Sequence, residues 1–176
     1  FTGSFDGKGH SISGLFINRS TLNYVGLFGH HDSGKISNVF IDNCDINGNN
    51  RVGGLVGHNH APIRNCSVTG NVSGNDYVGG FIGRFQIPSG DDTSIRNSYA
   101  VVKVIGNQYV GGFVGFNPGG NIHDCYSAGA VFGNSNKGGF CGYSSGIISN
   151  CFFDNQTSGQ TTSDGGTGKY TSDMKT

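Results

Sequence analysis

The sequence has no tryptophan, only 3 prolines and only 12% charged residues, and its formal net charge is zero. Binding to nucleic acid relies on Lys and Arg side chains that meet phosphates, so neutrality and the lack of a basic stripe argue against such a partner. No apolar run approaches the roughly 18 residues of a membrane span. No signal peptide opens the chain, and Phe1-Thr2-Gly3 leads directly into repeat-like sequence. We therefore expect a mature or excised piece of a longer chain.

Glycine is abundant instead, with 33 residues, but collagen and disorder are both excluded. Proline is scarce and there is no three-residue period. The 13 Phe and 7 Tyr recur largely in register, which disordered chains do not show. Apolar runs are short, rich in Val, Ile and Phe, and bounded by Gly, Asn and Ser, whereas each Gly costs a helix about 1 kcal/mol. The sequence thus predicts an ordered all-β fold.

One glycine-rich phrase is repeated along the chain. Its copies are YVGLFG at 24–29, RVGGLVG at 51–57, YVGGFIG at 77–83, YVGGFVG at 109–115 and KGGFCG at 137–142. Their closing glycines are 28, 26, 32 and 27 residues apart, and each copy is followed by Ile, one variable residue, and Asn or Asp. Short strands with tight turns in about 27 residues make one coil of a parallel β-solenoid, or β-helix. We predict about six coils in one domain, residues 1–153.

Stacked coils place like residues about 4.8 Å above one another, so the core is predicted to consist of columns. The first is an inward ladder of Ile12, Ile36, Ile63, Ile95, Ile122 and Ile148. Three residues further on lies a narrower column of Leu15, Val39, Cys66, Ser98, Cys125 and Cys151. Two more columns contain Val25, Val52, Val78 and Val110, and Leu27, Leu55, Phe81, Phe113 and Phe140.

Asparagine also recurs in columns, where side-chain amides can bond along the stack and the left-handed corner conformation is tolerated. One column is Asn38, Asn65, Asn97, Asp124 and Asn150, and the other is Asn49, Asn75, Asn107 and Asn134. The 5 cysteines are odd in number, and we expect buried thiols. A disulfide between Cys125 and Cys151, on adjacent coils, is the alternative.

Two segments depart from the repeat. The spacing of 32 marks an insertion in the 86–94 loop, and such insertions often form the binding face of a solenoid. Its Asp91 and Asp92 offer oxygen ligands for calcium. Residues 154–176 are rich in Ser, Thr and Gly, and form either a polar cap over the last coil or a linker.

These residues carry a family likeness. YVGGFVG followed by NIHDCYSAGAV resembles the GLUG repeat, and the opening FTGSFDGKGHSISGLFI and the closing CFFDNQTSGQTTSDGGTGKYTSDMKT resemble segments that flank such arrays. The resemblance implies large secreted or surface-anchored bacterial and archaeal proteins, including adhesin-like proteins. In related peptidases the chemistry lies in a separate zinc domain with an HExxH motif, which this sequence lacks. The likeness therefore predicts a prokaryotic cell-surface or extracellular location and a scaffold, not a reaction.

Histidines form the best candidate for a metal site. His30 and His31 follow one closing glycine, and His58 and His60 follow the next, one coil later. Stacked imidazoles with Asp32 close by could hold Zn²⁺ or Ni²⁺. The alternative is a solvated corner where histidine is tolerated, and we expect no obligate cofactor.

The same outward column continues through Arg84, Phe116 and Tyr143, with Phe85 and Asn117 beside it. An exposed strip of this kind could stack on sugar rings, although isolated exposed aromatics are ordinary. Tyr24, Arg51, Tyr77, Tyr109 and Lys137 are predicted to repeat this chemistry at the preceding corner. Glycan cleavage needs a carboxylate pair at a defined separation, and the 11 dispersed acidic residues offer none, so no enzyme activity is expected.

We therefore expect a non-catalytic structural or adhesive solenoid module of a surface or secreted protein. Its partners would be other domains of the same parent chain, or surface glycans. One alternative is a subunit that stacks end to end into an extracellular filament through its open β-edges. Another is a glycan-binding or glycan-processing β-helix.

Overall fold

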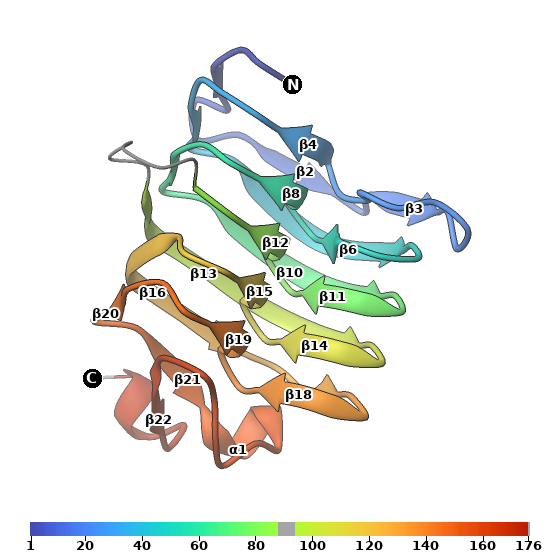
Figure 1. The fold of residues 1–176 in the computed structure, drawn as a ribbon. Helices are drawn as coiled ribbons and strands as arrows, with labels where there is room; N and C mark the ends of the chain where they lie inside the picture. Colours follow the sequence, from blue (N-terminus) through green and yellow to red (C-terminus); the bar gives the residue numbers. More distant parts are fainter. Residues whose placement is uncertain (88–93, 176) are drawn as a thin grey trace.

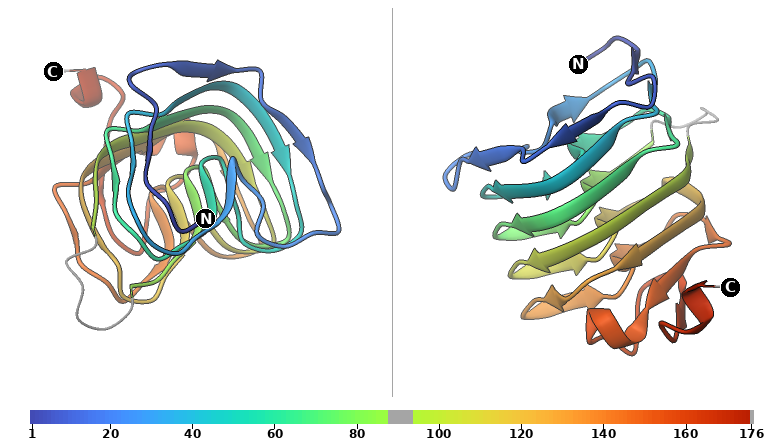
Figure 2. Two further views of the ribbon diagram at one scale, coloured as in Figure 1. Left: turned by 90° about the horizontal axis from the view of Figure 1, so that it is seen from above. Right: turned by 180° about the vertical axis from the view of Figure 1, so that it is seen from behind.

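The protein is described by a computed structural model that covers residues 1–87 and 94–175. Parallel strands coil around a single core and build three sheets that run along the same axis (Figure 1). Seen from above, successive coils lie over one another (Figure 2). The predicted parallel β-solenoid with a repeat of about 27 residues is confirmed, with about five turns where about six were expected.

In the described residues, the sheets have 13, four and five strands. The four-stranded sheet contains β7 (Val52–Gly53), β11 (Asp76–Gly79), β14 (Gln108–Gly111) and β18 (Ser135–Gly138). The five-stranded sheet contains β4 (Phe28–His31), β8 (Val56–Asn59), β12 (Ile82–Phe85), β15 (Val114–Asn117) and β19 (Cys141–Ser144). These two sheets are formed by the two halves of the glycine-rich phrase.

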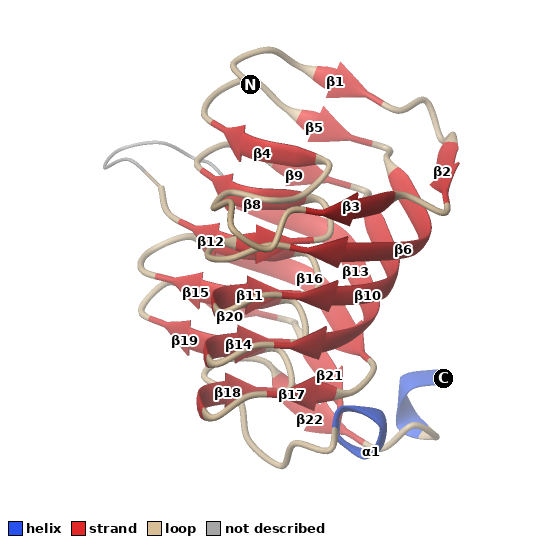
Figure 3. Ribbon diagram, turned by 90° about the vertical axis from the view of Figure 1, so that its right-hand side faces the viewer, coloured by secondary structure: helices blue, strands red, loops and turns tan. Residues whose placement is uncertain are grey.

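The 13-stranded sheet forms the longest wall of the solenoid (Figure 3). Its strands are β1 (Phe5–Asp6), β2 (Ser11–Ser13), β3 (Phe16–Asn18), β5 (Ile36–Ser37), β6 (Phe40–Asn47), β9 (Ile63–Arg64), β10 (Ser67–Ser73), β13 (Ser94–Ile105), β16 (Asn121–Ala128), β17 (Val131–Phe132), β20 (Ile148–Ser149), β21 (Phe152–Asp154) and β22 (Thr167–Lys169). Inward and outward side chains alternate along the second part of β13, from Ser98 to Ile105.

Paired glycines let neighbouring coils approach each other closely. A Cβ atom on Gly80 would lie 2.3 Å from the carbonyl oxygen of Gly112, and one on Gly112 would lie 2.2 Å from that of Gly139. No side chain fits at these distances, so the glycine phrase is required by backbone-to-backbone contact between coils.

The predicted core columns are largely confirmed. Phe81, Phe113 and Phe140 stack with ring centroids 4.6 and 4.9 Å apart and are fully buried. Val52, Val78 and Val110 pair in register, and Val25 joins them through a bridge to Val52. The isoleucine ladder pairs Ile36, Ile63, Ile95, Ile122 and Ile148 in order.

The first coil departs from the prediction. Ile12 pairs with Ile41, and Phe5 takes the place above Ile36. Leu15 lies beside Asp45, whose backbone nitrogen donates to the Leu15 carbonyl, and not above Val39. The physical reason is a turn at 7–10, which shifts β2 to the second half of the coil below.

The asparagine column adopts the expected left-handed corner. Its φ angles are 55° at Asn38, 54° at Asn65, 51° at Asn97, 54° at Asp124 and 50° at Asn150. Asn65 Nδ2 donates to Asn38 Oδ1 at 3.3 Å, and Asn97 Nδ2 donates to Asn65 Oδ1 at 3.4 Å. Asn150 likewise donates to Asp124. These bonds tie neighbouring coils together at the same corner.

The C-terminal segment packs under the last coil. Asp154 caps the short helix α1 (Asn155–Ser158), and β22 pairs in parallel with β21. Ser163 Oγ accepts hydrogen bonds from the backbone nitrogens of Phe140 and Cys141 at 3.1 and 2.8 Å. The segment ends in a 3₁₀ turn, η1 (Asp173–Lys175). It therefore occupies backbone positions that a further coil would otherwise fill.

All five cysteines are buried and none is in a disulfide, so the expectation of buried thiols is confirmed. Burial raises the pKa of the Cys44 and Cys66 thiols to about 11. These thiols act as small apolar groups in the core.

Candidate functional site on the lateral face

The outward residues of the five-stranded sheet and of the corner before it form one continuous surface, called here the lateral strip. On the sheet, His30 pairs with His58, and His58 pairs with Arg84. The column continues from Arg84 to Phe116 and from Phe116 to Tyr143. The corner before the sheet contributes Tyr24, Arg51, Tyr77 and Tyr109.

The corner residues have an unexpected backbone conformation. The φ angles are 60° at Tyr24, 57° at Arg51, 59° at Tyr77 and 56° at Tyr109, in the left-handed region that bulky residues rarely adopt. The sequence pattern gave no sign of this, because left-handed corners were expected at asparagines. The conformation directs the side chains outward, beside the column on the five-stranded sheet.

Aromatic rings stack on one another along the strip. Tyr77 and Tyr109 lie 5.1 Å apart with planes at 2°, and Phe116 and Tyr143 lie 5.0 Å apart with planes at 17°. Tyr109 meets Phe116 edge-on at 5.0 Å. The guanidinium of Arg84 lies 5.7 Å from the Phe116 ring. Because neighbouring rings cover one another's faces, few ring faces are left for a flat ligand.

Four sequence-based placements on this face are wrong. Phe85 and Asn117 are fully buried, because strand alternation turns them inward next to Arg84 and Phe116. The Asn117 side chain donates from Nδ2 to the carbonyl of Gly120 and accepts at Oδ1 from the backbone nitrogen of Gly120. Lys137 pairs with Val110, so that it belongs to the valine column and not to the tyrosine corner. His31 is also buried, and its Nδ1 lies 2.7 Å from Asn59 Oδ1.

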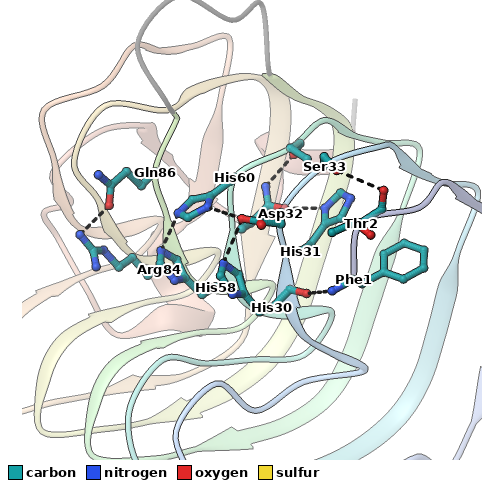
Figure 4. Close-up of polar contacts among 12 residues, drawn as sticks. Phe1, Thr2, His30, His31, Asp32, Ser33, His58, His60, Arg84 and Gln86 are labelled. Carbon is teal, nitrogen blue, oxygen red and sulfur yellow. Dashed lines mark hydrogen bonds and ion pairs between the residues drawn. The ribbon is translucent and has the colours of Figure 1, made fainter.

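The other three histidines of the predicted metal site, His30, His58 and His60, gather at the N-terminal end of the strip (Figure 4). The His30 and His58 rings stack 4.9 Å apart at 6°, and His60 meets both nearly edge-on. His60 Nε2 lies 3.1 Å from His58 Nε2, and His60 Nδ1 lies 3.0 Å from Asp32 Oδ1. The predicted grouping of His30, His58 and His60 is thus present, but His31 is not part of it.

The electrostatics of the cluster favour the neutral form of the His30 and His58 imidazoles. Burial lowers the pKa of His58 to about 3, and the nearby charges of His60, Arg84 and His30 act in the same direction. Burial also lowers the pKa of His30. The hydrogen bond from His60 lowers the pKa of Asp32. At neutral pH the neutral rings of His30 and His58 therefore lie close to an ionised carboxylate.

Two further places bear on the predicted sites. Asp91 and Asp92, the candidate calcium ligands, lie outside the described residues.

A groove of about 600 Å³ lies between β17 and α1, and includes Lys137 and Gln160 in its wall. The sequence did not indicate this groove, because it exists only once the tail folds against the last coil.

The architecture defines the class of the protein as a parallel β-solenoid repeat protein. The family model described as the GLUG motif matches residues 48–73 and 106–131. The chain therefore carries GLUG repeats, as the resemblance predicts. No solved structure is significantly similar to this chain.

Two relatives share part of the sequence. Halomucin of Haloquadratum walsbyi is 43% identical over 90 residues, which cover 51% of this chain and 1% of halomucin. A protein of Evansella cellulosilytica described as a Gly-rich membrane protein is 40% identical over 72 residues, which cover 39% of this chain and 8% of that protein. The chain thus matches only a small part of each relative's length. Among the described residues, no helix is long and apolar enough to cross a membrane.

Proposed function

We propose that this chain is a non-catalytic β-solenoid module of a cell-surface or secreted prokaryotic protein, and that it serves as a rigid structural segment with an adhesive lateral face. The observation that carries the proposal is the continuity of the stack. The same core ladder recurs from coil to coil and side-chain bonds between asparagines join several of the coils, so that the segment resists bending. The names of the two relatives, halomucin and a Gly-rich membrane protein, support a surface location.

The location is tested with antibodies raised against the purified chain. Intact cells of the organism that encodes the chain, or their culture supernatant, are expected to give a signal. Labelling that appears only after the cells are permeabilised would overturn the proposal.

Adhesion is tested separately by surface plasmon resonance against immobilised polysaccharides, both neutral and uronic-acid-rich. The strip offers aromatic edges and the cations Arg51 and Arg84, so we expect weak binding to acidic glycans. The double variant Arg84→Ala/Tyr143→Ala is expected to lose this binding. A matched control is Lys103→Ala/Tyr126→Ala, which changes exposed residues of the 13-stranded sheet. Equal binding by both variants would show that the strip is not the adhesive face.

A filament of chains stacked end to end has less support. The tail segment already bonds to the last coil through Ser163 and β22, where a second copy would have to add its strands. Negative-stain microscopy across a concentration series tests this point. Discrete particles are expected, and long filaments would reinstate the alternative.

A further inference from the structure

The histidine cluster on the lateral strip has the composition and spacing of a metal site. We propose that His30, His58 and His60 together bind one late transition-metal dication, with Zn²⁺ as the expected ion, and that Asp32 supports the site as a hydrogen-bond acceptor. One ligand nitrogen from each of the three rings lies within 4.8 Å of the other two. This inference is independent of any glycan binding by the same face.

Two of the three ligands already have nearly the spacing that a shared ion requires. In a tetrahedral site with Zn–N bonds of about 2.0–2.1 Å, two ligand nitrogens lie roughly 3.4 Å apart. His58 Nε2 and His60 Nε2 lie 3.1 Å apart. His30 is more exposed, with 43% of its side chain accessible, so that a small rotation can bring its nitrogen to the same point. The site therefore needs little rearrangement.

Asp32 determines which nitrogen of His60 is available. The Nδ1–H of His60 donates to Asp32 Oδ1 at 3.0 Å, which leaves the Nε2 lone pair directed toward His58. A carboxylate behind a ligating histidine fixes the tautomer and raises the basicity of the ring. Asp32 Oδ1 also lies 3.6 Å from His30 Nε2, so its carboxylate is close to two of the three rings.

The pairing between His58 and His60 is better satisfied by a cation than by a proton. A proton between the two Nε2 atoms is covalently bonded to only one of them. A metal ion between them is coordinated by the lone pairs of both nitrogens. His58 is 7% exposed, and its Nδ1 has no hydrogen-bond partner in the described structure.

The surroundings also contain positive charge. Arg84 lies one coil below His58 in the same column, and its Nη2 donates to Gln86 Oε1 at 2.6 Å. Arg51 lies 4.8 Å from the Tyr24 ring, which stacks on His30 and His58. These guanidinium groups reduce the affinity for a dication, and we therefore expect moderate binding. Imidazole ligands select Zn²⁺, Ni²⁺ or Cu²⁺ over Mg²⁺ and Ca²⁺, which prefer oxygen.

The test is calorimetric titration of the untagged, EDTA-stripped and dialysed chain with Zn²⁺ at pH 7.5, with Mg²⁺ as a comparison. We expect one Zn²⁺ per chain, with a Kd on the order of micromolar, and no Mg²⁺ binding. His60→Gln and His30→Gln are each expected to weaken Zn²⁺ binding at least about tenfold. His10→Gln, which changes an exposed histidine outside the cluster, is expected to leave binding unchanged. Absence of saturable Zn²⁺ binding, or equal affinity in all three variants, would overturn the proposal.

A second measurement guards against variants that fail to fold. Long-range ¹H–¹⁵N spectra of the wild-type chain report on each imidazole nitrogen directly. Addition of Zn²⁺ is expected to shift the Nε2 signals of His58 and His60 and to leave those of His10 and His123 in place. Shifts confined to His10 or His123 would place the ion elsewhere and refute the site.

Discussion

The ring of Phe81 stacks on the ring of Phe113 in the next coil, with centroids 4.6 Å apart and planes at 13°. The two residues lie in equivalent positions of consecutive glycine phrases, and both are fully buried. Phe140 continues the stack at 4.9 Å. The core is therefore built by contacts between like residues, and each phenylalanine contributes to the stability of two interfaces.

Replacement of the central ring should show this dependence. Phe113→Ala removes contacts to both Phe81 and Phe140, and we expect a loss of about 3–5 kcal/mol in the free energy of unfolding. Urea denaturation followed by circular dichroism measures the change. The control is Phe132→Ala, a phenylalanine that is 53% exposed, with an expected cost below about 1 kcal/mol. Similar costs for the two variants would contradict the stacked-core description.

The close approach of the coils makes a second prediction. In Gly112→Ala, the new methyl group would lie 2.2 Å from the carbonyl oxygen of Gly139, so the two coils must move apart. We expect destabilisation of about 2–3 kcal/mol or more. Gly3→Ala serves as the control, because its methyl group meets only the Phe1 ring at 3.5 Å. The description of the glycine pair is wrong if both variants unfold at the same urea concentration.

The asparagine corner separates two contributions to stability. Asn65 has φ of 54° and bonds to both Asn38 and Asn97. Asn65→Ala loses these bonds and adds left-handed strain, for an expected cost of about 2 kcal/mol. Asn65→Gly loses the same bonds without the strain, and should cost about half as much. If glycine is as costly as alanine in thermal unfolding, backbone strain is not what selects the residue at this corner.

The tail should contribute stability that depends on pH. Burial raises the pKa of Asp154, but hydrogen bonds from Thr171 and from the backbone of Thr157 and Gln156 outweigh this effect, so its pKa lies below the ordinary 3.8. Because the folded state binds fewer protons than the unfolded state, the stabilisation is present above pH 3.8 and is lost as the pH falls through the lowered value. Asp154→Ala should cost about 1–2 kcal/mol at pH 7.

The pH dependence provides the control for this substitution. The difference in unfolding free energy between the wild-type chain and Asp154→Ala should shrink as the pH is lowered from 4 toward 2. Asp45→Ala, at an exposed aspartate of β6, should change stability little at any of these values. A constant difference for Asp154→Ala would show that the carboxylate charge has no part in the cap.

Much of the fold could be predicted because a solenoid repeats the same strands and corners in each coil. The recurring sequence phrases aligned Ile63 with Ile95 and Phe81 with Phe113, in spite of the insertion between them. Strand pairing confirms the alignment of the isoleucines, and ring stacking confirms that of the phenylalanines. The first coil was misaligned because it lacks a glycine phrase to define its register, and a single turn moved Ile12 opposite Ile41. Lys137 was misplaced because Asn136, and not Lys137, takes the corner position in the last copy, with φ of 47°. The glycines set the register of Lys137 against Val110.

The candidate site was only partly predictable for a different reason. Stacking correctly placed His30 beside His58, since both follow a closing glycine. The inward or outward direction of the next residue depends on strand alternation, which turned His31, Phe85 and Asn117 into the core. The left-handed corner at Tyr77 and Tyr109, which brings their rings beside Phe116, has no marker in the residue types.

The sequence by itself determined the class of fold, the repeat length and the composition of the core, because these follow from periodic residues that must stack on like residues in parallel strands. Only the tertiary structure decided which side chains share a surface. The ring of His60 reaches both His58 on its own coil and Asp32 on the coil above, and this meeting depends on the path of the chain after β8. The folding of the tail under Phe140 was equally undetermined by pattern. It rests on hydrogen bonds that Ser163 and Asp154 accept from backbone nitrogens, and not on a repeated motif.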